Sequence, residues 1–482
     1  MWSFLIALVV LVVGYFTYGV IVERVFGVDK SRTTPAYTHN DGVDYVPMSP
    51  WRVFLIQFLN IAGLGPIFGA IMGIQFGPSA FLWIALGTIF AGGVHDFFSG
   101  MLSVRDDGSS QSEYAGKELG NATRQLLRLL SVLLLVLIGA VFVINPAKLL
   151  ANLCDGALDG FFSVTFWIIA IFTYYILATL VPIDKVIGRF YPIFGFIMLF
   201  MAIGLLVVLF AQYTEFIPEF TDGLHNRYAD PESHPIFPMM FVSIACGAIS
   251  GFHSTQSPLM ARCIENERYG RPIFYGAMVA EGIVALIWAA ATIAFFRGDF
   301  TALGEYIHKA GSAAPLVNDL CVSWLGTFGG ILAILGVVAA PITSGDTALR
   351  SARLIVADTF KIKQDRIGKR LLISVPLFIV ASLIMSIEYE SLWRYFGWTN
   401  QLLATFTLWA IAIWLLRHSK PWIIALLPAI FMTMVTSSYI FVAPEGIPLN
   451  NPTLAYIIAA VVTASVIVWF LMKVRAHRNG RL

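Results

Sequence analysis

Charged residues are scarce in this sequence: Asp, Glu, Lys and Arg make up 12% of its 482 residues. Water-soluble domains carry about 25%, so this shortage excludes an ordinary soluble protein. The hydrophobic fraction is 58%, and a single soluble core stops growing beyond about 250–300 residues. The fold class that remains is an all-α, polytopic integral membrane protein.

Cysteine is also rare, and the net charge is small. Four cysteines exclude a scaffold built from disulfides, and no CxxC or Cys/His spacing predicts a bound metal. A formal charge of +2 gives no basis for a nucleic-acid partner.

Long apolar runs dominate instead. A transmembrane helix needs about 20 apolar residues, and the sequence predicts thirteen such spans. They centre on 2–22, 52–74, 79–103, 125–145, 161–181, 190–213, 237–258, 273–296, 324–342, 371–387, 393–416, 421–442 and 453–472. The first lacks a basic leading segment and a cleavage site, so we expect a retained helix rather than a signal peptide.

Lys and Arg lie mainly in alternate loops. The odd-numbered loops and the C-terminal tail hold 26 of the 31 basic residues, and the even-numbered loops hold five. Cytoplasmic loops carry the excess of Lys and Arg, so we predict the N-terminus outside and the C-terminus in the cytoplasm. Cys154 and Cys321 then both lie in external loops, where we favour two free thiols and leave a disulfide open.

The second span is interrupted near its middle by Gly63, Gly65 and Pro66. Proline cannot donate a backbone hydrogen bond and clashes with the preceding turn. Unpaired backbone at this depth is tolerated only where it lines a cavity or is buried in protein. We therefore predict a broken helix, with a simple proline kink as the alternative. Glycines repeat every four residues from Gly65 to Gly77, which gives the second half a flat packing face.

The seventh span contains the most polar intramembrane segment of the chain, residues 250–257. Gly247, Gly251 and Pro258 bracket this run. Polar side chains inside a membrane are costly unless partners or a ligand satisfy them. We predict a second broken helix here, in contact with substrate.

The two breaks lie five spans apart, in spans that run in opposite directions. This pattern predicts an inverted repeat of five helices each, with a substrate site at the midplane. The expected divisions are 1–50 (an extra helix and cytoplasmic loop), 51–213 (spans two to six), 214–416 (spans seven to eleven) and 417–482 (two helices and a basic tail). The predicted substrate contacts are Gly63, Gly65, Pro66, Ser250, Gly251, Phe252, His253, Ser254, Thr255 and Gln256.

Two histidines and two acids lie well within the spans: His95, Asp96, His253 and Glu281. His95 and Asp96 lie about 12–15 Å from the predicted cytoplasmic end of the third span. A His–Asp pair can hold and release a proton near neutral pH, and a structural hydrogen bond is an equally good interpretation. Neighbouring helix residues point about 100° apart, so contact between the two is not assumed. His253 is predicted to contact a ligand or relay a proton, and Glu281 to pair with a neighbouring helix.

Four stretches resemble the carbon starvation protein (CstA) family, in order along the chain. They are NDGVDYVP followed by NIAGLGPIFG, then AGGVHDFFSGMLSVRDDG, then CGAISGFH, and finally SGDTALRSARLIVAD with FGWTNQLLA downstream. The resemblance covers about residues 40 to 415. It implies a bacterial inner-membrane secondary transporter with a LeuT-like fold that takes up pyruvate or peptides when carbon is scarce. This chain is shorter than the long members, and the run after His253 differs from theirs.

The same resemblance implies a possible sodium site. In LeuT-like sodium symporters, a carbonyl and two hydroxyls on the helix equivalent to the ninth span bind sodium together with carbonyls of the first broken helix. The matching positions here are Ala62, Gly63, Ala340, Thr343 and Ser344. Hydroxyls at such positions also often bond back to the preceding turn.

Two further polar groups have open roles. Asp346 either closes the ion site or pairs with Arg350 one turn on, and we favour the pair. Asn400 and Gln401 form an amide pair in the eleventh span, for which helix–helix hydrogen bonding is the expected role and cavity lining the lesser alternative.

The sequence thus predicts a secondary active importer, coupled to an ion gradient, for a small carboxylate nutrient. An ion or solute channel, a non-transporting nutrient sensor and an intramembrane enzyme are the alternatives; the enzyme is disfavoured because no HExxH or GxSxG pattern occurs. No cofactor is expected, and the partners are a small-molecule substrate and the lipid bilayer. As coupling ion we prefer the proton, through His95, Asp96 or His253, because titratable groups are concentrated in the spans; sodium is the alternative.

Overall fold

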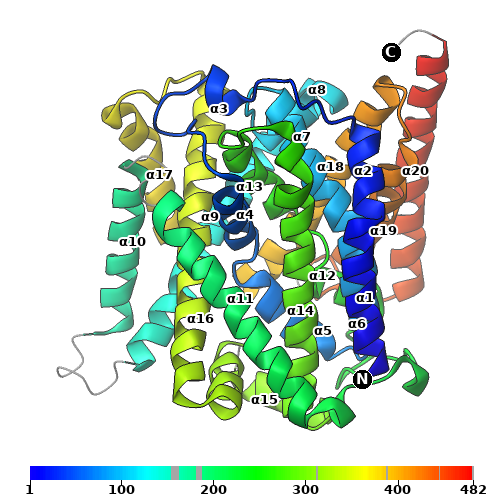
Figure 1. Ribbon diagram of the computed structural model, residues 1–482. Helices are drawn as coiled ribbons and strands as arrows, with labels where there is room; N and C mark the ends of the chain where they lie inside the picture. Colours follow the sequence, from blue (N-terminus) through cyan, green and yellow to red (C-terminus); the bar gives the residue numbers. More distant parts are fainter. Residues whose placement is uncertain (154–161, 181–186, 311–312, 387–388, 445, 480–482) are drawn as a thin grey trace.

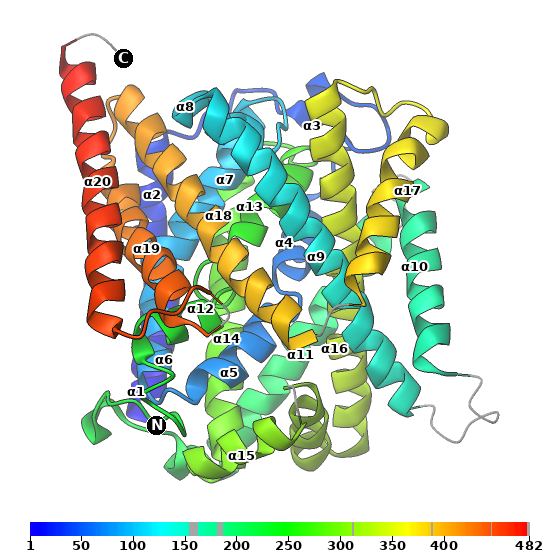
Figure 2. The same ribbon diagram turned by 180° about the vertical axis from the view of Figure 1, so that it is seen from behind.

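The protein is a bundle of long helices that stand side by side (Figures 1 and 2). The computed structural model describes residues 1–153, 162–180, 187–310, 313–386, 389–444 and 446–479. The two termini lie at opposite ends of the bundle, with α3 and α8 at the end of the C-terminus and α15 at the end of the N-terminus (Figure 1). This arrangement agrees with an odd number of membrane crossings.

The helices carry the labels of Figure 1. Their bounds are α1 (Trp2–Phe16), α2 (Tyr18–Phe26), α3 (Pro35–Thr38), α4 (Pro50–Ile61), η1 (Gly65–Gly69), α5 (Ala70–Ile74), α6 (Ser79–Gly87), η2 (Thr88–Gly92), α7 (Gly93–Arg105), α8 (Gln111–Leu119), α9 (Asn121–Leu153), α10 (Val164–Leu180), α11 (Ile187–Gln212), η4 (Thr214–Phe216), η5 (Phe220–Asp222), η6 (Ile236–Met240), α12 (Phe241–Ser243), α13 (Gly251–Ala261), η7 (Glu267–Tyr269), η8 (Arg271–Tyr275), α14 (Gly276–Phe295), α15 (Phe300–Ala310), α16 (Ala314–Phe360), α17 (Ile367–Ile384), α18 (Tyr389–Arg417), α19 (Ile423–Val442) and α20 (Pro452–Arg478).

The predicted spans fall mainly on these helices, but their number stays a prediction. Among the described residues, nine helices are long and apolar enough to cross a membrane, or ten when the bent pair formed by α4 and the following half-helix is counted. The apolar part of α10 is shorter than a full span. α12 and α13 are short pieces on either side of a gap, and α16 is much longer than one span.

The predicted break in the second span is confirmed. α4 ends at Ile61, helix resumes at Gly65, and the two halves are bent by 53°. Pro66 lies in the first turn of η1, where a missing N–H removes no helical hydrogen bond. The predicted close packing is also present, because a Cβ built on Gly65 would lie 2.1 Å from the Cβ of Cys246.

The predicted break in the seventh span is confirmed as well, and it is wider. α12 ends at Ser243, α13 begins at Gly251, and residues 244–250 between them form turns. Cys246 in this segment packs directly on Gly65, and a Cβ on Gly247 would lie 4.0 Å from the Cα of Pro66. The two spans therefore meet at the points where both lose their helical hydrogen bonds.

The ninth span differs from its predicted range of 324–342. α16 is a 47-residue helix whose backbone leaves helical geometry at Gly326, with φ at +65°. The helix extends beyond the predicted span, as far as Phe360. Arg350 and Arg353 lie beyond the predicted span but on this helix, with fully buried side chains.

A single acid allows both arginines to be buried. The carboxylate of Asp44 accepts hydrogen bonds from Arg350 Nη1 at 3.0 Å and from Arg353 Nη2 at 3.1 Å. Burial opposes the ionisation of Asp44, but the guanidinium groups of Arg353 and Arg350 lower its pKa to about 2. Hydropathy missed this extension of the helix because the compensating charge lies 306 residues away in the sequence.

The packing at Gly251 gives a direct test of the fold. A Cβ there would lie 2.3 Å from Asn400 O and 2.6 Å from Ala404 N, backbone atoms that cannot move without shifting α18. Overpacking of this kind costs about 1–3 kcal/mol, so Gly251→Ala should lower the melting temperature of the purified protein. Gly368→Ala is the control, since a Cβ at Gly368 meets nothing within 4 Å. Equal melting temperatures in the two variants would contradict this packing.

Candidate functional site

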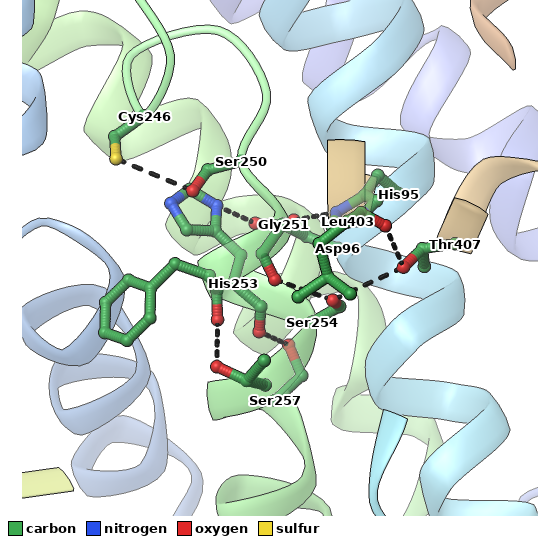
Figure 3. Close-up of polar contacts among 12 residues, drawn as sticks. His95, Asp96, Cys246, Ser250, Gly251, His253, Ser254, Ser257, Leu403 and Thr407 are labelled. Carbon is green, nitrogen blue, oxygen red and sulfur yellow. Dashed lines mark hydrogen bonds and ion pairs between the residues drawn. The ribbon is translucent and has the colours of Figure 1, made fainter. Parts of the chain in front are cut away.

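The polar run predicted to line the second break forms the first turns of α13. Ser250 precedes this helix in an extended conformation, with φ at −146°. Every residue from 250 to 257 is buried, and α13 packs against α7, α18, α4 and α16. The close-up in Figure 3 shows these side chains in the interior of the bundle.

Four titratable side chains form a continuous chain in this interior. His95 Nδ1 lies 2.7 Å from Asp96 Oδ1, and Asp96 Oδ2 lies 2.8 Å from His253 Nδ1 (Figure 3). On its other side, His253 Nε2 lies 3.4 Å from Glu281 Oε2. All four side chains are fully buried. The structure therefore brings together the three predicted proton-coupling residues, and it adds Glu281.

Two sequence expectations about these residues have clear outcomes. Contact between His95 and Asp96 was not assumed, but the two oxygens of Asp96 contact one imidazole each, so it bridges His95 on its own helix and His253 on α13. The expectation that Glu281 pairs with a neighbouring helix is confirmed by its contact with His253.

The chain of titratable groups is incompletely satisfied. The Nε2 atoms of His95 and His253 and both carboxylate oxygens of Glu281 have no hydrogen-bond partner. At 3.4 Å, the contact between Glu281 and His253 is an ion-pair distance without hydrogen-bond geometry. Buried polar groups in native proteins nearly all have partners, so these atoms mark where a proton, an ion or a substrate atom can be received.

Asn400 caps the N-terminus of α13 from a different helix. Its Oδ1 accepts hydrogen bonds from the backbone N–H of Phe252 at 2.6 Å and from the hydroxyl of Ser250 at 3.0 Å. The predicted helix–helix role of Asn400 is confirmed, and Gln401 beside it donates to Phe241 O at 3.5 Å. The N–H of Phe252 is consequently occupied rather than open to a substrate carboxylate.

The remaining hydroxyls of the run mainly satisfy the helix itself. Ser254 donates to Gly251 O at 2.7 Å, Thr255 to Phe252 O at 2.6 Å, and Ser257 to His253 O at 3.0 Å. Such back-bonding is the usual behaviour of Ser and Thr within helices. Gln256 differs, because its Oε1 is buried without a partner.

The candidate sodium ligands lie close together. Ser344 donates to Leu59 O at 3.1 Å, and a Cβ on Gly63 would lie 3.0 Å from Ser344 Oγ. Thr343 donates to Ala340 O at 2.8 Å, which is the back-bonding alternative. Ser344 therefore faces the first break, whereas Thr343 bonds back to its own helix, and an ion bound to both hydroxyls would displace these two hydrogen bonds.

Asp346 does not make the contact that was favoured for it. Its Oδ2 accepts a hydrogen bond from the hydroxyl of Tyr191 at 2.7 Å, while Arg350 pairs with Asp44 at 3.0 Å. The proposed Asp346–Arg350 pair is thus replaced by two contacts with residues distant in sequence, which spacing along one helix could not indicate. Cys154, the other half of the possible disulfide, lies outside the described residues, and Cys321 is a buried free thiol.

Sequence reasoning missed three residues around the breaks. Asn60 is buried in the last turn of α4, and both of its side-chain polar atoms lack partners; an amide at the start of the NIAGLGP motif was the available signal. Tyr191 and Cys246 were also missed, because only the packing of distant segments places them beside Asp346 and Gly65.

A cavity of 420 Å³ opens away from the breaks, at the end of the bundle that carries the basic loops. Its lining includes Tyr45, Arg262 and Asp358. Arg262 donates to Gly108 O at 2.8 Å and lies 3.8 Å from the Asp358 carboxylate. No residue of the buried run 250–257 is among the residues that line this cavity, so the run is closed to solvent in this structure.

The fold is similar to that of a solved transporter structure. MhsT in complex with L-phenylalanine aligns with 89% of this chain and 99% of its own, with a TM-score of 0.55 and 14% identity. At that identity the likeness concerns the fold alone, and it agrees with the predicted LeuT-like arrangement.

The sequence comparisons identify relatives. An uncharacterized membrane protein of Haemophilus influenzae is 45% identical over 67% of this chain and 97% of its own length. The peptide transporter CstA of Campylobacter jejuni is 27% identical and the pyruvate/proton symporter BtsT of Escherichia coli 26% identical, each over 66% of this chain. These alignments span 53% and 52% of the two named proteins, about half of their length.

The family comparison extends over most of the sequence. Residues 1–165, 152–325 and 305–439 match the family described as carbon starvation protein CstA. These segments include both broken spans and every residue of the buried titratable chain. The protein therefore belongs to the carbon starvation protein CstA family.

Proposed function

We propose that this protein is a secondary active transporter that imports a small carboxylate-bearing nutrient together with a cation. The observation that carries the proposal is the meeting of two broken helices beside a fully buried chain of two imidazoles and two carboxylates. Broken helices at the midplane are typical of transporter substrate sites, and intramembrane titratable chains are typical of coupled transport. The named relatives, a peptide transporter and a pyruvate/proton symporter, favour pyruvate or short peptides as substrates.

The substrate would bind where the two breaks face each other. We expect the carboxylate to approach His253, whose Nε2 has no hydrogen-bond partner, with the backbone near Gly63, Gly65 and Pro66 on the opposite side. The halves 51–213 and 214–416 would then rock about this point to expose it alternately. In the enclosed state Cys246 fills the space beside Gly65, so the halves must separate before substrate enters.

The proton is our preferred coupling ion. His95, Asp96 and His253 form a hydrogen-bonded chain with open Nε2 atoms at both ends, which suits the uptake and release of a proton. The alternative is sodium at Ala62, Gly63, Ala340, Thr343, Ser344 and Asp346. At that place the two hydroxyls already donate to protein carbonyls, so an ion must displace existing hydrogen bonds.

The charge of the substrate determines how many cations must accompany it across the membrane. A monoanion moving inward alone works against an inside-negative potential at about 2.3 kcal/mol per 100 mV. One accompanying cation cancels this cost, and a second would raise accumulation about 50-fold. Coupling to at least one cation is therefore needed for uptake against a gradient.

The central test is uptake into proteoliposomes that contain the purified protein. Pyruvate, lactate, dipeptides and amino acids are offered, with proton and sodium gradients imposed separately. Under the proton proposal, uptake persists when choline replaces sodium and collapses when the pH gradient is dissipated. Thr343→Ala with Ser344→Ala should then leave the ion dependence unchanged. A sodium requirement that this double variant weakens by more than about 10-fold would reverse the assignment, and absence of saturable counterflow would favour a channel.

Replacing His253 by Gln separates substrate contact from proton coupling. Glutamine can still form hydrogen bonds within the protein, but it cannot titrate or carry a positive charge. If His253 binds the substrate carboxylate, the variant loses one hydrogen bond between charged groups. The binding free energy should then weaken by about 1.5–3 kcal/mol, which is a 10- to 150-fold weaker apparent affinity. If His253 also carries the proton, the pH profile of uptake should flatten. His308→Gln, at an exposed position on α15, is the matched control. A His253→Gln protein with wild-type affinity and pH profile would remove this residue from the site.

We also propose that the protein lies in the bacterial inner membrane with the C-terminus in the cytoplasm. The basic loops and the C-terminus lie at the same end of the bundle (Figure 1), as the excess of cytoplasmic Lys and Arg requires. A membrane-impermeant maleimide added to intact spheroplasts should label Asp222→Cys and leave Lys363→Cys unlabelled. The reverse labelling would invert this orientation.

A further inference from the structure

Three metal-ligating side chains converge beside the crossing of the broken helices. The ligand atoms of Cys246, His253 and Glu281 all lie within 4.8 Å of one another, and all three residues are buried. We infer that these three side chains form a binding site for a divalent transition-metal ion of the zinc class. They come from the turn segment 244–250, from α13 and from α14, which is why their spacing in the sequence gives no metal motif.

The chemistry of the donors selects the kind of ion. A thiolate, an imidazole and a carboxylate supply one sulfur, one nitrogen and one oxygen, a set that suits Zn²⁺ and similar ions rather than Mg²⁺ or Ca²⁺. Three protein ligands leave the fourth position of a tetrahedral ion open to water or to another small ligand. Binding requires that the thiol of Cys246 lose its proton.

The geometry is close to what such an ion needs. Around a tetrahedral Zn²⁺ with bonds of about 2.0–2.3 Å, ligand atoms lie about 3.3–3.8 Å apart. His253 Nε2 and Glu281 Oε2 are already 3.4 Å apart. Nε2 and both Glu281 oxygens have no hydrogen-bond partner, and Cys246 Sγ has only weak contacts, with Ser250 Oγ at 3.5 Å and Asn400 Nδ2 at 3.9 Å. Small side-chain rotations therefore suffice to close the site.

The outer shell of the site is already in place. A metal-ligating histidine almost always engages a carboxylate, carbonyl or water through its other ring nitrogen. Here His253 Nδ1 lies 2.8 Å from Asp96 Oδ2, and Asp96 Oδ1 lies 2.7 Å from His95 Nδ1 (Figure 3). This contact directs Nε2 of His253 toward Cys246 and Glu281. The orienting contact that a metal-ligating histidine needs is therefore present before an ion binds.

Bound metal would act on transport, and this consequence rests on the proposed function. Cys246 packs on Gly65 of the first broken span, while His253 and Glu281 belong to α13 and α14. An ion bound to all three residues would link these segments and keep the two breaks in contact. It would also occupy His253 Nε2, the atom proposed to bind the substrate carboxylate. The metal is therefore expected to inhibit solute uptake rather than to assist it.

The test is direct binding of Co²⁺ to the purified full-length protein, with Zn²⁺ as competitor. Wild type should bind one ion and show a thiolate-to-metal charge-transfer band that Zn²⁺ removes. Cys246→Ser should lose this band, and Glu281→Gln should weaken binding at least 10- to 100-fold, the range seen even for outer-shell changes. Cys263→Ser and Cys321→Ser remove buried thiols outside the cluster and should keep the band.

The possible outcomes separate this inference from the proposed function. Each variant is first compared with wild type by melting temperature, so that loss of binding is not confused with loss of folding. A charge-transfer band that survives in Cys246→Ser, or no saturable binding by wild type, overturns the metal site even where solute uptake is normal. Metal binding without solute uptake upholds the site and contradicts the transporter. Uptake that Zn²⁺ leaves unchanged, or accumulation of the metal itself in the vesicles, overturns the inhibitory role.

Discussion

The backbone groups released at the two helix breaks are the constraint on which the rest of this structure depends. No water reaches them from the bilayer, so protein groups must satisfy them. The structure meets this need with side chains from other helices: Thr88 donates to Gly247 O, Ser344 donates to Leu59 O, and Asn400 accepts from the N–H of Phe252. Glycines at the contact points, Gly65 and Gly247, allow the two broken spans to pack closely at their breaks.

Buried charge obeys a second constraint, since an isolated ion is costly to remove from water. Two clusters of buried charge in the described part of the chain illustrate how this cost is met. At the basic end of the bundle, Asp44 is held between Arg350 and Arg353. At the centre, Asp96 lies between two imidazoles, and Glu281 faces the second of them. Arg353 Nε in the first cluster and the Nε2 atoms of His95 and His253 in the second have no hydrogen-bond partner, but only the second cluster contains imidazoles, which exchange protons near neutral pH.

The sequence was sufficient for the features that depend on local composition. Pro66 and its neighbouring glycines predicted one break, and the polar density of residues 250–257 predicted the other, because both signals act on the helix that contains them. The residues that pair with these features could not be predicted from the sequence, because they are distant along the chain. The Asn400 cap lies 148 residues from Phe252, and the Asp44 pair lies 306 residues from Arg350. For the same reason the predicted ninth span stops before Arg350, since hydropathy scores a charge without its distant counter-charge.

The contact between Asp96 and His253 gives a physical reason for coupling. These residues are 157 positions apart, and in the proposed division Asp96 belongs to the first repeat and His253 to the second. In the proposed mechanism, a motion that separates the repeats lengthens this contact and removes one of the two imidazole partners of the buried Asp96 carboxylate, which costs free energy. This cost is removed when Asp96 or His253 changes its protonation. It is also removed when an ion or a substrate group takes the place of His253 beside Asp96. Movement of the repeats and occupancy of the site are then linked, because neither change is favourable without the other.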